Sequence, residues 1–282
     1  MNRLIIRMTL LVMVLSTKML AQDFHGMAVY ELKTNLKDFK IESKDMNDEM
    51  TKMMMESMKK EFEKKYFLNF NKYESVYEEE QKLEAPSAAS SNGFSFVVES
   101  SGEGGGKTYK NVKEKTQLVE EDFFGKEFLV ADSLKAWKWE LKDETKKIGS
   151  YTCYKAIHLD AVTAEDLKQY EDFKKQQETS KATFFVIDEP KDRITTVWYS
   201  PEIPVSHGPG EFWGLPGLIL EANFDDTTIL CSKIVLNPKN KTDIKKPKTG
   251  KKVTKKEYES LIEKQMEQMK DVDGNIKIEI HR

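Results

Sequence analysis

Residues 218–236 read LILEANFDDTTILCSKIVL, two short apolar runs separated by a pair of aspartates. Leu218–Phe224 and Thr228–Leu236 are rich in aliphatic and β-branched residues, and turn-forming residues bound both runs. Runs of this length and composition are typical of β-strands. Two such strands, joined by so short a connection, predict an antiparallel hairpin.

The same pattern recurs along most of the chain. Further strand candidates are Ala28–Leu32, Tyr66–Phe70, Phe94–Val98, Thr116–Val119, Phe128–Val130, Trp137–Leu141, Tyr151–Leu159, Thr183–Ile187 and Ile194–Tyr199. Because these runs follow one another closely with few helices between them, they favour hairpins over strand–helix–strand units. The sequence therefore predicts a mainly β (α+β) fold, a single curved antiparallel sheet or partly open barrel with accessory amphipathic helices.

Three segments have helical periodicity instead. Methionines recur at intervals of four between residues 46 and 58, which predicts a helix near 45–64. Thr163–Asp166 and Thr254–Glu257 have the form of capping boxes, which predict helices near 164–178 and 254–270. After the last helix, alternating isoleucines at 276, 278 and 280 predict a final strand.

The N-terminus has the features of an export signal. Arg3 and Arg7 precede an apolar run from Met8 to Leu15, and Ala21 stands at a suitable cleavage point. The run is too short to cross a membrane, which takes about 20 apolar residues. We expect a signal peptide at residues 1–21, cleavage near Ala21 and a mature chain without a transmembrane span. The expected location is the periplasm or the cell surface, or the medium after secretion, and export argues against a nucleic-acid partner.

Residues 196–221 read TVWYSPEIPVSHGPGEFWGLPGLILE. Their hexapeptide Gly214-Leu215-Pro216-Gly217-Leu218-Ile219 is the motif that names the GLPGLI family, and the chain resembles that family here and at Ile148–Ala156. The resemblance implies an exported protein of the Gram-negative envelope with no established activity, so no catalytic residue can be carried over. It also implies one GLPGLI-type domain over residues 22–282, to which the helices near 45–64 and 254–270 are additions.

The hexapeptide predicts a type II turn, because Pro216 fixes φ at the second position and Gly217 supplies a positive φ at the third. Trp213 and the Leu218 side of the following strand are then expected to be buried. Four prolines, including Pro216 of the turn itself, stiffen this loop, and Trp198, His207, Phe212 and Trp213 lie on or beside it. Since stiff aromatic loops form good ligand walls, a purely structural loop and a ligand-binding loop both remain open.

Cysteines and methionines are the candidate metal or redox residues. An oxidising compartment permits a disulfide between Cys153 and Cys231, and two separate buried thiols are the alternative. Two cysteines are too few for a zinc site. Met50, Met54 and Met58 are thioether ligands for Cu(I) in one interpretation and packing residues of an amphipathic helix in the other.

No catalytic or cofactor motif stands out. Ser101–Thr108 lacks the glycine spacing of a phosphate-binding loop, and Ser206-His207 lies outside any nucleophile elbow. We therefore expect no cofactor and a non-enzymatic envelope binding or accessory protein. Its partner would be an apolar ligand on the concave face of the sheet, or an outer-membrane or envelope protein. The alternatives are a periplasmic copper handler that uses the methionine-rich helix and a surface interaction protein that uses the lysine-rich segment 239–256.

Overall fold

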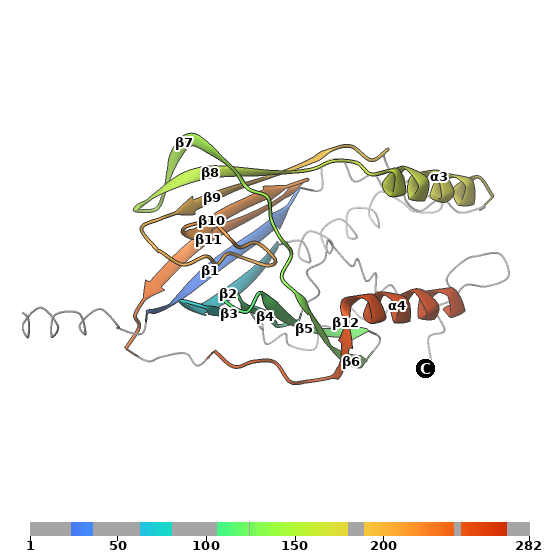
Figure 1. Ribbon diagram of the computed structural model, residues 1–282, viewed down its shortest axis with the longest axis horizontal. Helices are drawn as coiled ribbons and strands as arrows, with labels where there is room; N and C mark the ends of the chain where they lie inside the picture. The colour runs from blue at the N-terminus through green and yellow to red at the C-terminus, as the bar shows by residue number, and fades with distance from the viewer. Residues whose placement is uncertain are drawn as a thin grey trace, which may run out of the picture.

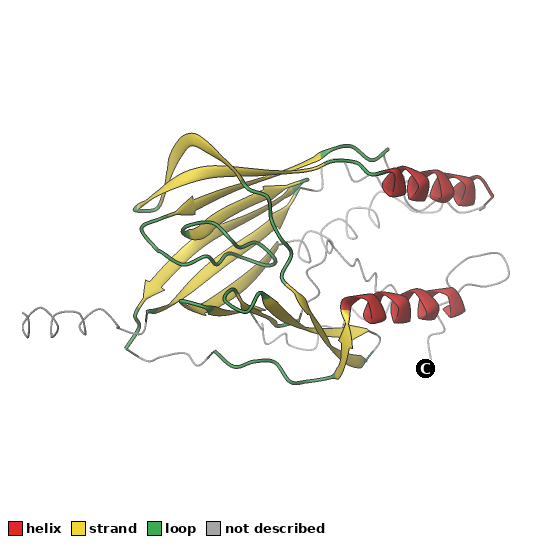
Figure 2. Ribbon diagram, viewed as in Figure 1, coloured by secondary structure: helices red, strands yellow, loops and turns green. Residues whose placement is uncertain are grey.

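The computed structural model describes residues 24–35, 63–80, 106–123, 125–179, 189–239 and 244–269. Within these ranges the chain forms one large twisted sheet and two helices (Figures 1 and 2). The strands are β1 (His25–Thr34), β2 (Glu63–Asn71), β3 (Glu74–Glu79), β4 (Thr108–Asn111), β5 (Thr116–Phe123), β6 (Lys126–Ser133), β7 (Glu140–Ile148), β8 (Tyr151–Asp160), β9 (Arg193–Ser200), β10 (Leu218–Phe224), β11 (Thr227–Leu236) and β12 (Lys251–Thr254). The helices are α3 (Ala164–Thr179) and α4 (Lys255–Met269).

The sheet has twelve strands in the order β12-β6-β5-β4-β3-β2-β1-β11-β10-β9-β8-β7. Every neighbouring pair is antiparallel except β12 and β6, which run parallel. β7 and β12 stand at the two ends of this order, so the sheet is open. The predicted mainly β class, a single and mostly antiparallel sheet with accessory helices, is confirmed.

The main core lies on one face of the sheet. Leu68 stands opposite both Ala28 and Tyr77, and Val197 stands opposite both Ala156 and Ala222. All of these residues are buried. Because directly opposed residues share a face of the sheet, the register alone gathers small and aromatic side chains into one layer.

A second, smaller core lies where α4 meets β6 and β12. It consists of Phe128, Val130, Val253 and Tyr258, with the Tyr258 ring edge-on to Phe128 at 5.3 Å. The predicted capping box fixes the start of α4, because the Thr254 amide donates to the Glu257 carboxylate at 2.8 Å and the Glu257 amide donates to Thr254 Oγ1 at 3.2 Å.

The other predicted helices have different outcomes. α3 begins after Thr163, whose side chain accepts a hydrogen bond from the Asp166 amide at 3.2 Å, as the capping box predicts. The helix predicted near 45–64 is wrong at its last two positions, since Glu63 and Lys64 open β2 and pair with β1. Residues 45–62 lie outside the described residues, as do the signal peptide at 1–21, Phe94–Val98, Thr183–Ile187 and the isoleucines at 276–280.

The strand predicted at Trp137–Leu141 is also largely wrong. Residues 134–139 have no regular structure, and β7 begins at Glu140. Apolar alternation did not mark β7, β12 or the short strands β3 and β4. In β7 the reason is physical: the strand is at the edge of the sheet, none of its residues is fully buried, and charged side chains fill it.

Neither α3 nor α4 combines the length and the apolar composition that a membrane-crossing helix needs.

Candidate functional site

The loop between β9 and β10, residues 201–217, lies against the core face of the sheet. Figure 1 shows this segment crossing in front of the strands that flank it. Its side chains at Ile203, Val205, Phe212 and Leu215 are buried in the same core as Tyr30 and Phe70. The loop that holds the hexapeptide is therefore an inner layer of the fold.

Lys110 on β4 holds this loop in place. Its side chain is fully buried, and its Nζ donates hydrogen bonds to the carbonyl oxygens of Gly208 at 2.9 Å, Gly210 at 2.6 Å and Phe212 at 3.0 Å. A charged donor strengthens each of these bonds, and the three carbonyls in turn satisfy the buried ammonium.

His207 is fully buried beneath the loop. Its Nε2 lies 3.0 Å from the carbonyl oxygen of Asn71 at the end of β2. A carbonyl can only accept, so Nε2 carries the proton and donates. Burial and, to a smaller extent, the nearby Lys110 charge lower the pKa of His207 to about 3. His207 is thus a neutral structural residue, and its Nδ1 has no hydrogen-bond partner among the described residues.

Three tryptophans connect the loop to residues 134–139. The Trp137 and Trp139 indoles donate to the carbonyl oxygens of Glu211 and Trp213 at 3.1 and 2.8 Å, and the Trp213 indole donates back to Lys135 at 2.8 Å. The Trp137 and Trp139 rings stack at 5.0 Å. The sequence predicted Trp137 and Trp139 to lie in a strand, and their partners in the loop are 74 residues away, so no local pattern marked this contact.

Two predictions about the hexapeptide are wrong. Trp213 is half-buried, and the neighbouring Phe212 is the core residue. The positive φ belongs to Gly214, at 97°, and not to Gly217, so the turn is not type II. Gly217 is needed for another reason, because a Cβ there would lie 2.3 Å from the Ser200 carbonyl oxygen. The predicted burial of Leu218 is confirmed.

The structure does not bring the four predicted ligand-binding residues together. His207 and Phe212 lie in the core, and Trp213 lies in the tryptophan contact. Trp198 alternates with buried Val197 along β9 and so faces the other side of the sheet. There the Lys146 Nζ lies 4.3 Å from the centre of the Trp198 ring and 2.6 Å from Glu221 Oε2.

The disulfide between Cys153 and Cys231 is absent, since both residues are free buried thiols. Cys153 is on β8 and Cys231 on β11, and β9 and β10 stand between them. Three strand spacings amount to roughly 14 Å along the sheet, whereas bridged cysteines have Cα atoms less than about 7 Å apart. Burial raises the pKa of Cys153 to about 11 and of Cys231 to about 12.

Metal ligands do not gather in the part of the chain that the structure describes. No group of three or more His, Cys, Asp or Glu residues there is arranged to hold an ion. The candidate copper ligands Met50, Met54 and Met58 lie outside the described residues.

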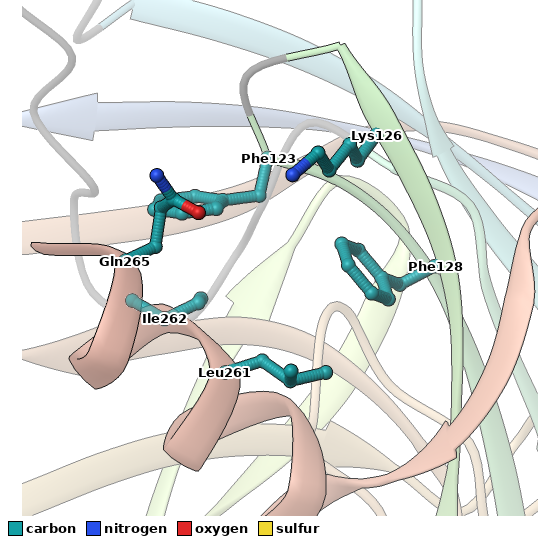
Figure 3. Close-up of a pocket in the computed structure, with 6 residues that line it drawn as sticks. All are labelled: Phe123, Lys126, Phe128, Leu261, Ile262 and Gln265. Atoms are coloured by element: carbon teal, nitrogen blue, oxygen red, sulfur yellow. The ribbon is translucent and has the colours of Figure 1, made fainter. Parts of the chain in front are cut away.

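A cavity of about 270 Å³ lies between α4 and the β5–β6 hairpin (Figure 3). It is lined by Phe123, Lys126, Phe128, Leu261, Ile262 and Gln265. The two sides come from segments more than a hundred residues apart, so no local motif marked this cavity in the sequence.

Comparison with known proteins yields one family match. A family model described as "Protein of unknown function (Porph_ging)" matches residues 139–221. A search of curated proteins finds no significant match. Solved structures of PNGF-II in space groups C2 and P21 both give a TM-score of 0.47, at 12% and 11% identity, and cover 86% and 87% of this chain. The chain spans about a third of those proteins, 33% and 34% of their length. The matched segment contains both Ile148–Ala156 and the hexapeptide 214–219, and the description of the family model assigns it no function.

Proposed function

We propose that this protein is an exported envelope protein of the GLPGLI family that acts by binding and not by catalysis. The family name rests on the resemblance of Ile148–Ala156 and the hexapeptide 214–219, and both segments lie within residues 139–221, which match a family model of unknown function. The basic residues and short apolar run before Ala21 support export to the periplasm or cell surface.

The hydrogen bonds from Lys110 to the loop are the observation that supports binding over catalysis. The Lys110 ammonium donates hydrogen bonds to the carbonyl oxygens of Gly208, Gly210 and Phe212. The His207 Nε2 donates to the carbonyl oxygen of Asn71. Polar groups that are buried and already paired with the protein are not available to polarise a substrate. On this proposal the hexapeptide loop maintains the scaffold, and binding takes place at surfaces outside the loop.

Native mass spectrometry of the chain, produced in a Gram-negative host and purified from its envelope fraction, tests the proposal. The expected spectrum has a mass that lacks residues 1–21 and a non-covalent adduct that is lost on denaturation. A full-length mass recovered from the cytoplasm would contradict export. A processed protein without an adduct, from repeated preparations and in complex with no other protein, would contradict the binding role.

A further inference from the structure

The cavity beside α4 has a rigid apolar wall. Phe128 forms its floor on β6 and is held by Tyr258, while parallel pairing of β12 with β6 fixes the start of α4 one residue later. Phe123 and Ile262 pack against this small core and also line the cavity. The cavity is thus preformed by folded elements on both sides, which spares a ligand the cost of ordering them.

The size of the cavity limits what it can hold. At about 270 Å³ it exceeds the roughly 150 Å³ of an engineered cavity that binds benzene, and it falls just below the range of about 300–1,000 Å³ for drug-sized ligands. Four of its six lining residues are apolar. One unbranched alkyl chain of medium length fits such a space and gains from leaving water.

The polar lining residues identify the head group. Figure 3 shows the Lys126 ammonium directed toward Phe123 and Gln265, with Leu261 at the other end of the cavity. Lys126 is exposed, and it forms no ion pair with any other residue in the described ranges. A cation beside an apolar cavity complements a ligand that has an anionic head and an apolar chain. The Gln265 amide offers a further hydrogen-bond donor to the head.

We infer that this cavity binds a straight-chain amphiphile with a carboxylate-type anionic head, the alkyl chain between α4 and β6 and the head at Lys126. This inference rests on the proposed binding function and names the ligand class for it.

Titration of the purified full chain with dodecanoate, below its micellar concentration and followed by calorimetry, tests the inference. The wild type should bind dodecanoate more tightly than dodecyltrimethylammonium by roughly twofold to fivefold, the range of an exposed ion pair. Lys126→Glu should reverse that preference. Leu261→Trp fills the cavity and should weaken dodecanoate binding at least tenfold.

Leu167→Trp is the matched control, because Leu167 on α3 is 42% exposed and Leu261 on α4 is 38% exposed. The control should bind dodecanoate as the wild type does. If Leu261→Trp fails to fold, Lys126→Glu alone tests the inference. An unchanged preference for dodecanoate in that variant would then overturn it.

The outcomes separate this inference from the proposed function. Equal affinity for dodecanoate in the wild type and Leu261→Trp would place binding elsewhere and overturn the cavity. No dodecanoate binding, in a protein that still carries an adduct from the envelope, would overturn the ligand class alone. A protein that carries no adduct and binds neither amphiphile would overturn both.

Discussion

At Gly217 the missing side chain matters because of the backbone beside it. A Cβ would meet the carbonyl oxygen of Ser200 at 2.3 Å, which no small adjustment relieves. We expect Gly217→Ala to lower the free energy of unfolding by about 1–3 kcal/mol, the cost of forcing extra volume into a packed site. Chemical denaturation of the variant and the wild type measures the difference.

Asparagine at the same position distinguishes crowding from backbone conformation. If crowding governs, Gly217→Asn should be at least as damaging as Gly217→Ala. At Gly214, where φ is 97° and the nearest atom to a new Cβ is 3.8 Å away, the order should reverse, since asparagine tolerates positive φ better. If Gly217→Asn lost less stability than Gly217→Ala, the result would favour a positive φ at Gly217, as a type II turn requires.

His207 gives the fold a specific sensitivity to acid. Burial holds its pKa at about 3 in the folded protein, whereas the unfolded chain has the ordinary value of about 6.5. Between these values only the unfolded state takes up the proton, so stability falls as the pH drops from about 6.5 to 3, by at most about 5 kcal/mol.

Melting curves of wild type and His207→Gln across pH 3–7 test this prediction. Glutamine does not titrate and retains a donor for Asn71, so the variant should lose stability less steeply over that window. Parallel pH profiles for the two proteins would show that His207 is not the group responsible.

At the scale of elements, the contact between β4 and the loop depends on one side chain. Lys110→Met keeps the length of the side chain and removes the ammonium, which leaves the carbonyls of Gly208, Gly210 and Phe212 without this donor. Each buried acceptor left unpaired costs about 1–3 kcal/mol, so we expect a total loss of roughly 3 kcal/mol or more.

Lys248→Met is the control for Lys110→Met, because Lys248 is exposed and the same substitution there should change stability by less than about 0.5 kcal/mol. Equilibrium unfolding of both variants makes the comparison. Similar midpoints for the two would mean that Lys110 does not hold the loop.

Most strands of the main core could be predicted from their apolar residues, whereas strands at the ends of the sheet order were missed. β1 and β8 to β11 line the main core, and their apolar residues were visible in the sequence. β7 has no fully buried residue, and Val253 is the one buried residue of β12. These two strands form because a neighbouring strand offers hydrogen bonds, which the composition of a segment does not record.

The site could be predicted only in part, for a similar reason. The sequence located the loop and its aromatic residues, but Lys110 in Thr108–Asn111 resembles an ordinary surface lysine. Its partners lie about a hundred residues away, at Gly208 to Phe212. The role of Gly217 likewise depends on the position of Ser200 in space, so local turn chemistry gave the wrong reason for a correctly singled-out residue.

At the scale of the whole molecule, an irregular segment forms an inner layer of a β-sheet protein. Buried loops are rare because their backbone polar groups need partners. Here Leu218 and Ile219 donate their amides to Ile203 and His207 at 3.0 Å, and Lys110 supplies donors for three further carbonyls. The small core beside α4 stands apart from this layer, so a ligand there need not disturb the main core.

Native-state hydrogen exchange of the amides of Phe212, Leu218 and Ile219 tests most directly whether the hexapeptide loop is part of the core. If it is, these amides should exchange as slowly as those of β1, which open only with the whole protein. Exchange as fast as that of the exposed turn at 112–115 would contradict the account, since the loop would then open on its own and be free to act as a binding loop.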